Sequence, residues 1–143
     1  MNALPSSRFR VQSNLSGQRF ILNFNIQIRQ SDKATLVDVS GKLTSFEAQA
    51  FRDAIHCLLQ QGNNNIILNL TALDYLDSSG IGELVRNYLA VVKKGGAMKV
   101  VGLAPKVEEI LKVTQLYQVF PEFPDEASAL ESFPERTRNA GAG

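Results

Sequence analysis

A continuously apolar strand that leads into the start of an amphipathic helix is the feature that most restricts the fold of this chain. The run Ile66-Ile67-Leu68-Asn69-Leu70 has one polar residue, which is typical of a strand buried on both faces. Asp77-Ser78-Ser79-Gly80 follows, and apolar residues then recur at helical spacing from Ile81 to Val92. A strand that needs cover on both faces, followed by a helix, predicts an α/β fold with a parallel inner sheet.

Strand and helix patterns alternate along the rest of the chain. Residues 22–29 alternate apolar and polar side chains, and residues 34–40 form the predicted hairpin partner, which Gly41 is expected to end. The remaining predicted strands cover residues 66–70, 98–103 and, at short length, 116–120. Four helices are predicted, opened by Thr44, Asp77, Pro105 and Asp125.

These elements predict one α/β domain with a mixed, mostly parallel sheet of four to five strands and about four helices. A length of 143 residues suits one domain with a real core. Residues 1–20 lack a clear period and are predicted to be a flexible arm, with an edge strand through Phe20-Ile21-Leu22 left open. The folded domain is expected over residues 21–134, followed by a disordered tail over 135–143.

Charge and composition exclude several classes of partner. A formal net charge of +1 creates no strong field, so no direct contact with nucleic acid is expected. No apolar run approaches the ~18 residues of a membrane span, so no membrane insertion is expected. The N-terminus lacks an apolar signal core, and the single cysteine, Cys57, permits no internal disulfide. A cytoplasmic location is predicted.

The inventory of reactive residues does not favour an enzyme. Gly-x-Ser-x-Gly is absent, and the only histidine, His56, lies in the first predicted helix, far from the serines in sequence. One Cys and one His do not supply a closed zinc site, and Gly80-Ile81-Gly82 lacks the third glycine of a dinucleotide fingerprint. No catalytic residue, cofactor or metal is predicted, and a small hydrolase using Ser78 or Ser79 is the weakest alternative.

The serines point instead to a residue that receives a phosphate. Ser78 and Ser79 are predicted at a helix N-terminus, where unpaired N–H groups and the helix dipole favour negative charge. Asp and Ser are also favoured helix caps, so spacing alone leaves capping and phosphate acceptance both open.

A wider pattern resembles a known family. The segment Asn69–Leu84, NLTALDYLDSSGIGEL, followed by Gly95-Gly96 and Leu103-Ala104-Pro105-Lys106-Val107, closely resembles the anti-sigma-factor antagonists of the STAS family. Residues 114–120 and 125–130 look like the ending of that family, and the resemblance covers residues 22–133. It implies a STAS-like domain.

The resemblance also implies a partner-switching function. In such proteins the serine directly after the aspartate is phosphorylated by an anti-sigma factor, a serine kinase with a GHKL-type ATP site. The unphosphorylated antagonist binds that kinase and frees the sigma factor; the phosphorylated form lets go, and a phosphatase restores it. By position the acceptor is Ser78. Asp77 and Ser79 would shape the acceptor turn, and Gly80 and Ile81 would belong to the docking surface.

One loop departs from the family pattern. Many members carry Gly-x-Leu-Asp after the second strand, whereas this chain has Gly41-Lys42-Leu43-Thr44. That loop is expected beside the serine turn, because both follow strand C-termini, so Thr44 is a candidate partner-binding residue as well as a predicted helix cap. Two alternatives stay open: a STAS accessory or scaffold subunit of a transporter or signalling complex that is never phosphorylated, and a weak homodimer through an exposed sheet edge.

Overall fold

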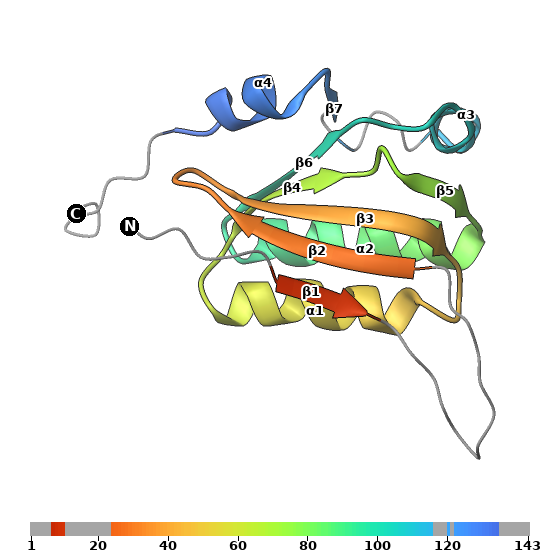
Figure 1. Ribbon diagram of the computed structural model, residues 1–143, viewed down its shortest axis with the longest axis horizontal. Coiled ribbons are helices and arrows are strands. Elements are labelled where there is room, and N and C mark those ends of the chain that lie inside the picture. The colour runs from red at the N-terminus through yellow and green to blue at the C-terminus, as the bar shows by residue number, and fades with distance from the viewer. Residues whose placement is uncertain (1–6, 11–23, 116–119, 121, 135–143) are drawn as a thin grey trace, which may run out of the picture.

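Seven strands form one mixed sheet in the computed structural model, which describes residues 7–10, 24–115, 120 and 122–134 (Figure 1). Along the sheet the order is β1-β2-β3-β4-β6-β7, and β5 pairs with the end of β3. The pairs β1–β2 and β2–β3 are antiparallel, and all other pairs are parallel. The strands are β1 Ser7–Arg10, β2 Phe24–Gln30, β3 Thr35–Leu43, β4 Asn65–Asn69, β5 Leu73–Leu76, β6 Ala97–Val101 and β7 Glu122–Phe123.

Helices cover both faces of this sheet. Helices α1 and α2 lie side by side on one face, and α4 packs on the other face against β4 and β6 (Figure 1). Helix α3 packs against β5, at the edge where α2 begins. The helices are α1 Ala48–Gln60, α2 Ser78–Lys93, α3 Pro105–Val113 and α4 Glu126–Glu131.

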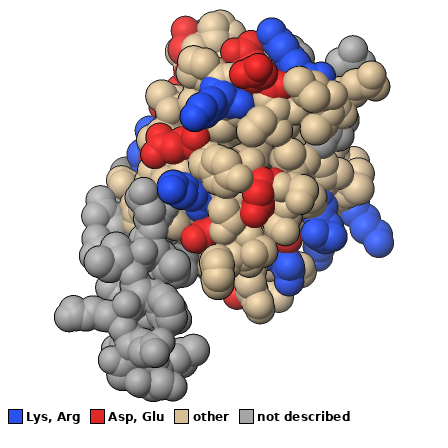
Figure 2. Space-filling view, turned by 90° about the vertical axis from the view of Figure 1, so that its right-hand side faces the viewer, with Lys and Arg blue, Asp and Glu red and all other residues tan. Residues whose placement is uncertain are grey.

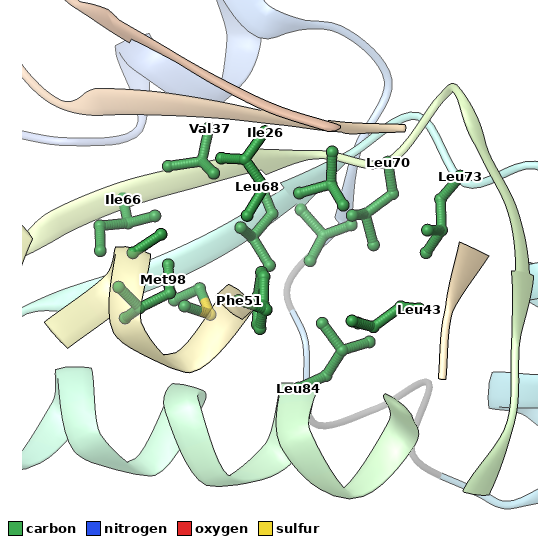
Figure 3. Packing of buried hydrophobic residues seen from close by; sticks show 14 of the residues in the cluster. Ile26, Val37, Leu43, Phe51, Ile66, Leu68, Leu70, Leu73, Leu84 and Met98 are labelled. Carbon is green, nitrogen blue, oxygen red and sulfur yellow. The ribbon is translucent and has the colours of Figure 1, made fainter. Parts of the chain in front are cut away.

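The apolar pattern of β4 explains why it lies at the centre of the sheet. Ile66 and Leu68 point into the large core between the sheet and helices α1 and α2, where they meet Phe51 and Leu84 (Figure 3). Ile67 points to the opposite face and joins a smaller core under α4. Both faces of β4 are therefore buried, as the continuous apolar run predicts.

Polar contacts hold α4 over the smaller core. The Arg29 guanidinium on β2 donates to Asp38 on β3, 2.7 Å away, and to Glu126 at the start of α4. Asn69 Nδ2 donates to the same Glu126 carboxylate at 3.1 Å. The hydrogen bonds from Arg29 lower the pKa of Glu126, so this carboxylate stays ionised and anchors the helix start.

The predicted fold class is confirmed: the domain is α/β, and its sheet is mixed and mostly parallel. The sheet is wider than the expected four to five strands, because the short strands β1, β5 and β7 extend it. Strand β5 has Asp74 and Tyr75 exposed between buried Leu73 and Leu76, so it shows neither strict alternation nor an apolar run. Ser7–Arg10 lies within the predicted arm and pairs with β2.

The prediction that Gly41 ends the second strand is wrong. Gly41 has a φ of 95°, a left-handed conformation that glycine adopts at little cost, and the register of β3 shifts between Gly41 and Lys42. The strand therefore continues to Leu43, pairing with β2 before the shift and with β5 around and after it. The predicted edge strand at 20–22, most of the predicted strand at 116–120 and the tail at 135–143 lie outside the described residues.

Candidate functional site

The serine motif forms the start of α2, as predicted. Asp77 is the N-cap in an extended conformation, with φ −104° and ψ −173°. Its carboxylate accepts a hydrogen bond from the Gly80 N–H at 2.9 Å, and its carbonyl accepts one from the Ile81 N–H at 2.9 Å. The first bond satisfies a donor that a helix start otherwise leaves free, and the second is the first regular hydrogen bond of the helix. Together they fix the conformation of the turn that carries both serines.

Both serine hydroxyls are accessible. Ser78 and Ser79 are exposed, and among the residues that the structure describes neither hydroxyl has a hydrogen-bond partner. Each hydroxyl is therefore available to a reacting or binding partner. A phosphoryl group on either serine would lie at the first helical turn, where the dipole of α2 favours negative charge.

Gly80 brings this turn into direct contact with the end of β3. A Cβ atom at Gly80 would lie less than 3.0 Å from the Leu43 carbonyl oxygen and 2.9 Å from Leu76 Cδ1. The Asp77 N–H also donates to the Leu43 carbonyl, at 3.4 Å. Gly80 is buried, and Ile81 is half-buried against the core. Of these two predicted docking residues, Gly80 therefore acts by allowing α2 to pack closely against the end of β3.

The turn between β3 and α1 follows Leu43, which contacts the start of α2, and hydrogen bonds hold it. The Thr44 N–H and hydroxyl both donate to Glu47 Oε1, at 2.8 and 2.6 Å. The Phe46 N–H donates to the Thr44 hydroxyl oxygen at 3.3 Å. The prediction that Thr44 caps the first helix is wrong: α1 begins only at Ala48, with Glu47 as its N-cap, and the hydrogen bonds between Thr44 and Glu47 instead close the turn before the helix. Thr44 is half-buried, and Phe46 is 82% exposed.

An ionic cluster around the buried carboxylate of Glu83 joins α2 to α1, and no sequence motif predicts it. The Glu83 side chain is 1% exposed and accepts from Arg52 Nε at 2.8 Å and Nη2 at 3.1 Å. Asn87 Nδ2 donates to the same carboxylate at 3.2 Å, and Arg86 lies 3.5 Å from it. The hydrogen bonds from Arg52 lower the pKa of Glu83. Burial of the carboxylate acts in the opposite direction, but its effect is smaller.

This cluster predicts a pH-dependent contribution to stability. The folded pKa of Glu83 is below its unfolded value, so the stabilisation is fully present above the unfolded value, about 4.3, and is lost as pH falls through the folded value. We expect Glu83→Gln to lower the free energy of unfolding at pH 7. The deficit relative to the unmutated chain should shrink progressively below pH ~4, which urea denaturation at several pH values measures.

The matched control is Glu109→Gln on α3. Glu109 is exposed and has no hydrogen bond or ion pair among the described residues, so its replacement should change stability little at any pH. A Glu83→Gln deficit that stays constant from pH 7 to pH 3 would contradict the assignment of the ionised form to the folded state.

The surface around the serines carries charges of both signs. Figure 2 faces the edge where α2, β5 and α3 meet, and acidic, basic and uncharged side chains are interspersed on it. No single sign dominates this face, which agrees with the formal net charge of +1. The affinity of a partner that docks here would therefore depend on local contacts more than on long-range electrostatic attraction.

Other features of the described residues do not lie at this edge. A hollow of about 420 Å³ between the C-terminal halves of α1 and α2 is lined by His56, Leu59, Gln60, Ala90, Lys93 and Lys94.

Within the described residues, no group of three or more His, Cys, Asp or Glu side chains could hold a metal ion. None of the described helices combines the length and apolar character that crossing a membrane requires.

Comparisons with known proteins find relatives that match most of this chain. The STAS domain model matches residues 25–129. The anti-sigma F factor antagonist of Paenibacillus polymyxa is 28% identical over 110 residues, covering 76% of this chain and 94% of that protein. The anti-sigma-B factor antagonist of Bacillus subtilis (strain 168) is 26% identical over 98 residues, 68% of this chain and 89% of that protein. The crystal structure of an anti-sigma factor antagonist from Mycobacterium paratuberculosis superposes with a TM-score of 0.69, at 25% identity, over 77% of this chain and 93% of that one.

Proposed function

The chain belongs to the STAS domain family, and on that premise we propose that it is an anti-sigma-factor antagonist switched by phosphorylation of Ser78. The unphosphorylated form binds an anti-sigma factor that is also a serine kinase, and thereby frees a sigma factor for transcription. The phosphorylated form releases the kinase, and a phosphatase restores the first state. In this role the chain is a cytoplasmic binding protein and performs no catalysis of its own.

One observation carries this proposal. Ser78 directly follows the capping aspartate Asp77, is exposed at the first residue of α2, and within the described residues keeps its hydroxyl free of hydrogen bonds. The relatives named anti-sigma factor antagonists match this chain over most of their own length, which supports transfer of the role. Ser79 is equally exposed, so the choice of Ser78 rests on its position after the aspartate.

Phosphorylation at this position would act on the surface and leave the fold in place. A phosphoserine carries about −1.5 to −2 charges, which the dipole at the start of α2 tolerates. The cap made by Asp77 does not use the serine hydroxyl, so the helix start keeps its hydrogen bonds. The added bulk and charge would instead lie at the centre of the docking surface, where they oppose binding.

Incubation with a candidate anti-sigma kinase and ATP tests the proposal. We expect intact-mass spectrometry to show a gain of one phosphate for the unmutated chain and for Ser79→Ala, and none for Ser78→Ala. Backbone NMR shifts of the phosphorylated form should change only near α2 and the turn after β3, because the fold is retained. Widespread shift changes would contradict a surface switch.

A chain that gains no phosphate from any cognate kinase would favour the alternative function, a STAS accessory or scaffold subunit of a transporter or signalling complex. Modification at Ser79 in place of Ser78 would keep the switch and overturn the assignment of the acceptor. The weak homodimer remains a separate prediction, and β1, the edge strand that lies within the predicted N-terminal arm, is the strand through which it would form.

A further inference from the structure

Phe46 is the most exposed of the large hydrophobic side chains in the described residues. It is 82% exposed, whereas Tyr75 and Leu89 are 45% and 58% exposed. The apolar stripe of α1, which is Phe51, Ala54, Ile55, Leu58 and Leu59, fills the core without it. Phe46 therefore contributes no packing that would explain an aromatic side chain at this position.

The backbone that presents Phe46 is fixed before any partner arrives. Thr44 donates two hydrogen bonds to the Glu47 carboxylate, and the Glu47 N–H donates to the Thr44 carbonyl at 3.1 Å. Glu47 is 5% exposed, so this carboxylate is anchored within the protein. An aromatic side chain with only two rotatable bonds, carried on a backbone that is already held, loses little conformational entropy on binding, which is the property of an interface anchor.

Phe46 also lies within reach of any protein that acts on Ser78. The Leu43 carbonyl accepts from the Asp77 N–H and packs against Gly80, so the turn after β3 and the start of α2 touch. A standard protein interface buries about 800 Å² on each partner, roughly 20–30 residues. A footprint of that size centred on Ser78 is wide enough to extend over the Thr44–Glu47 turn, which follows Leu43 directly in the chain.

We propose that Phe46 is the anchor for the anti-sigma factor, inserting into an apolar pocket on that protein beside the site that phosphorylates Ser78. This inference rests on the proposed function and deepens it: Phe46 supplies affinity and Ser78 supplies the switch. The occupant is the kinase that acts on Ser78, because the turn that carries Phe46 follows Leu43, which contacts the start of α2. The mixed charges on this face do not attract an anionic membrane.

The test measures binding and phosphorylation of Phe46→Ala with the kinase that modifies Ser78. We expect the Kd of the unphosphorylated complex to rise about 30-fold, as for a central aromatic anchor. The KM for phosphorylation should rise with it while kcat stays within about twofold, because Phe46 contacts the partner equally before and during phosphate transfer. Phe46→Leu should retain most of the affinity, since it keeps an apolar side chain.

Leu89→Ala is the matched control. Leu89 is also an exposed apolar side chain, but it lies eleven residues after Ser78 on α2, about 16 Å along the helix axis. Its replacement should change neither Kd nor KM. Thermal unfolding should be the same for both alanine variants and the unmutated chain to within about 0.5 kcal/mol, because neither side chain is buried.

The outcomes separate this inference from the proposed function. If Ser78 is phosphorylated but Phe46→Ala binds as tightly as the unmutated chain, the anchor is wrong and the switch stands. If no kinase modifies Ser78, the proposed function is wrong, and the inference that Phe46 anchors such a kinase is wrong with it. Two further results would overturn the inference by assigning Phe46 to another occupant. The first is a dimer of the chain alone, seen by sedimentation, that Phe46→Ala dissociates. The second is flotation with anionic vesicles that Phe46→Ala abolishes.

Discussion

Ser78→Asp is expected to weaken binding of the anti-sigma factor by more than about a hundredfold relative to Ser78→Ala, equivalent to ~3 kcal/mol. The carboxylate places a fixed charge where the proposed partner covers the start of α2, and that charge loses its water without gaining a counterion. Isothermal titration with the purified kinase measures the difference. A pull-down from lysate should likewise retain a kinase-like protein on the alanine form and lose it on the aspartate form.

Ser78→Asn separates charge from size in this experiment. Asparagine has nearly the shape of aspartate and no charge, so it should keep most of the affinity. Thermal unfolding of Ser78→Asp should match or slightly exceed that of the unmutated chain, because an acidic residue in the first turn of a helix contributes roughly 0.3–1 kcal/mol. Equal binding by the aspartate and alanine forms would remove the electrostatic basis of the switch.

Gly80→Ala and Gly82→Ala are expected to change stability in opposite directions, although the two glycines lie in the same turn of α2. At Gly80 a Cβ would lie less than 3.0 Å from the Leu43 carbonyl oxygen, a backbone atom that cannot rotate away. We expect a loss of about 3 kcal/mol in the free energy of unfolding. At Gly82 the nearest atom is Arg86 Nη2 at 3.5 Å, an ordinary contact.

Gly82→Ala should therefore stabilise the chain by roughly 0.5–1 kcal/mol, because alanine loses less backbone entropy than glycine in a helix. Urea denaturation of the two variants measures both effects under identical conditions. Gly80→Ala should also weaken partner binding, since relief of the clash moves the Thr44–Glu47 turn away from α2. Equal stability of the two variants would show that the contact between Leu43 and Gly80 is looser than described.

The start of α2 could be predicted because its determinants are local. Asp77 caps the Gly80 N–H three residues later, and this spacing is visible in the sequence. The same holds for Asp125, whose carboxylate accepts from the Ser128 N–H at 2.8 Å, and for Pro105 at the first position of α3. The buried apolar run of β4 predicted a central strand for an equally direct reason.

What could not be predicted depends on contacts distant in sequence. Arg52 and Glu83 are thirty-one residues apart, and each alone looks like an ordinary exposed charge on a helix. Glu83 is buried because α1 packs beside α2, and helical periodicity does not reveal which charged residue faces a neighbouring helix. Phe46 poses the converse problem: its apolar character suggests burial, and only the three-dimensional structure shows that its side chain is exposed to solvent.

The position of α4 has a practical consequence. This helix lies across the sheet from α1 and α2, away from the edge where α2 begins (Figure 1). Ala127 on α4 is exposed, whereas the single native thiol, Cys57, is half-buried in α1. A fluorophore attached through Ala127→Cys would therefore sit outside the proposed footprint, and its anisotropy would report the slower tumbling of a complex without obstructing the binding face.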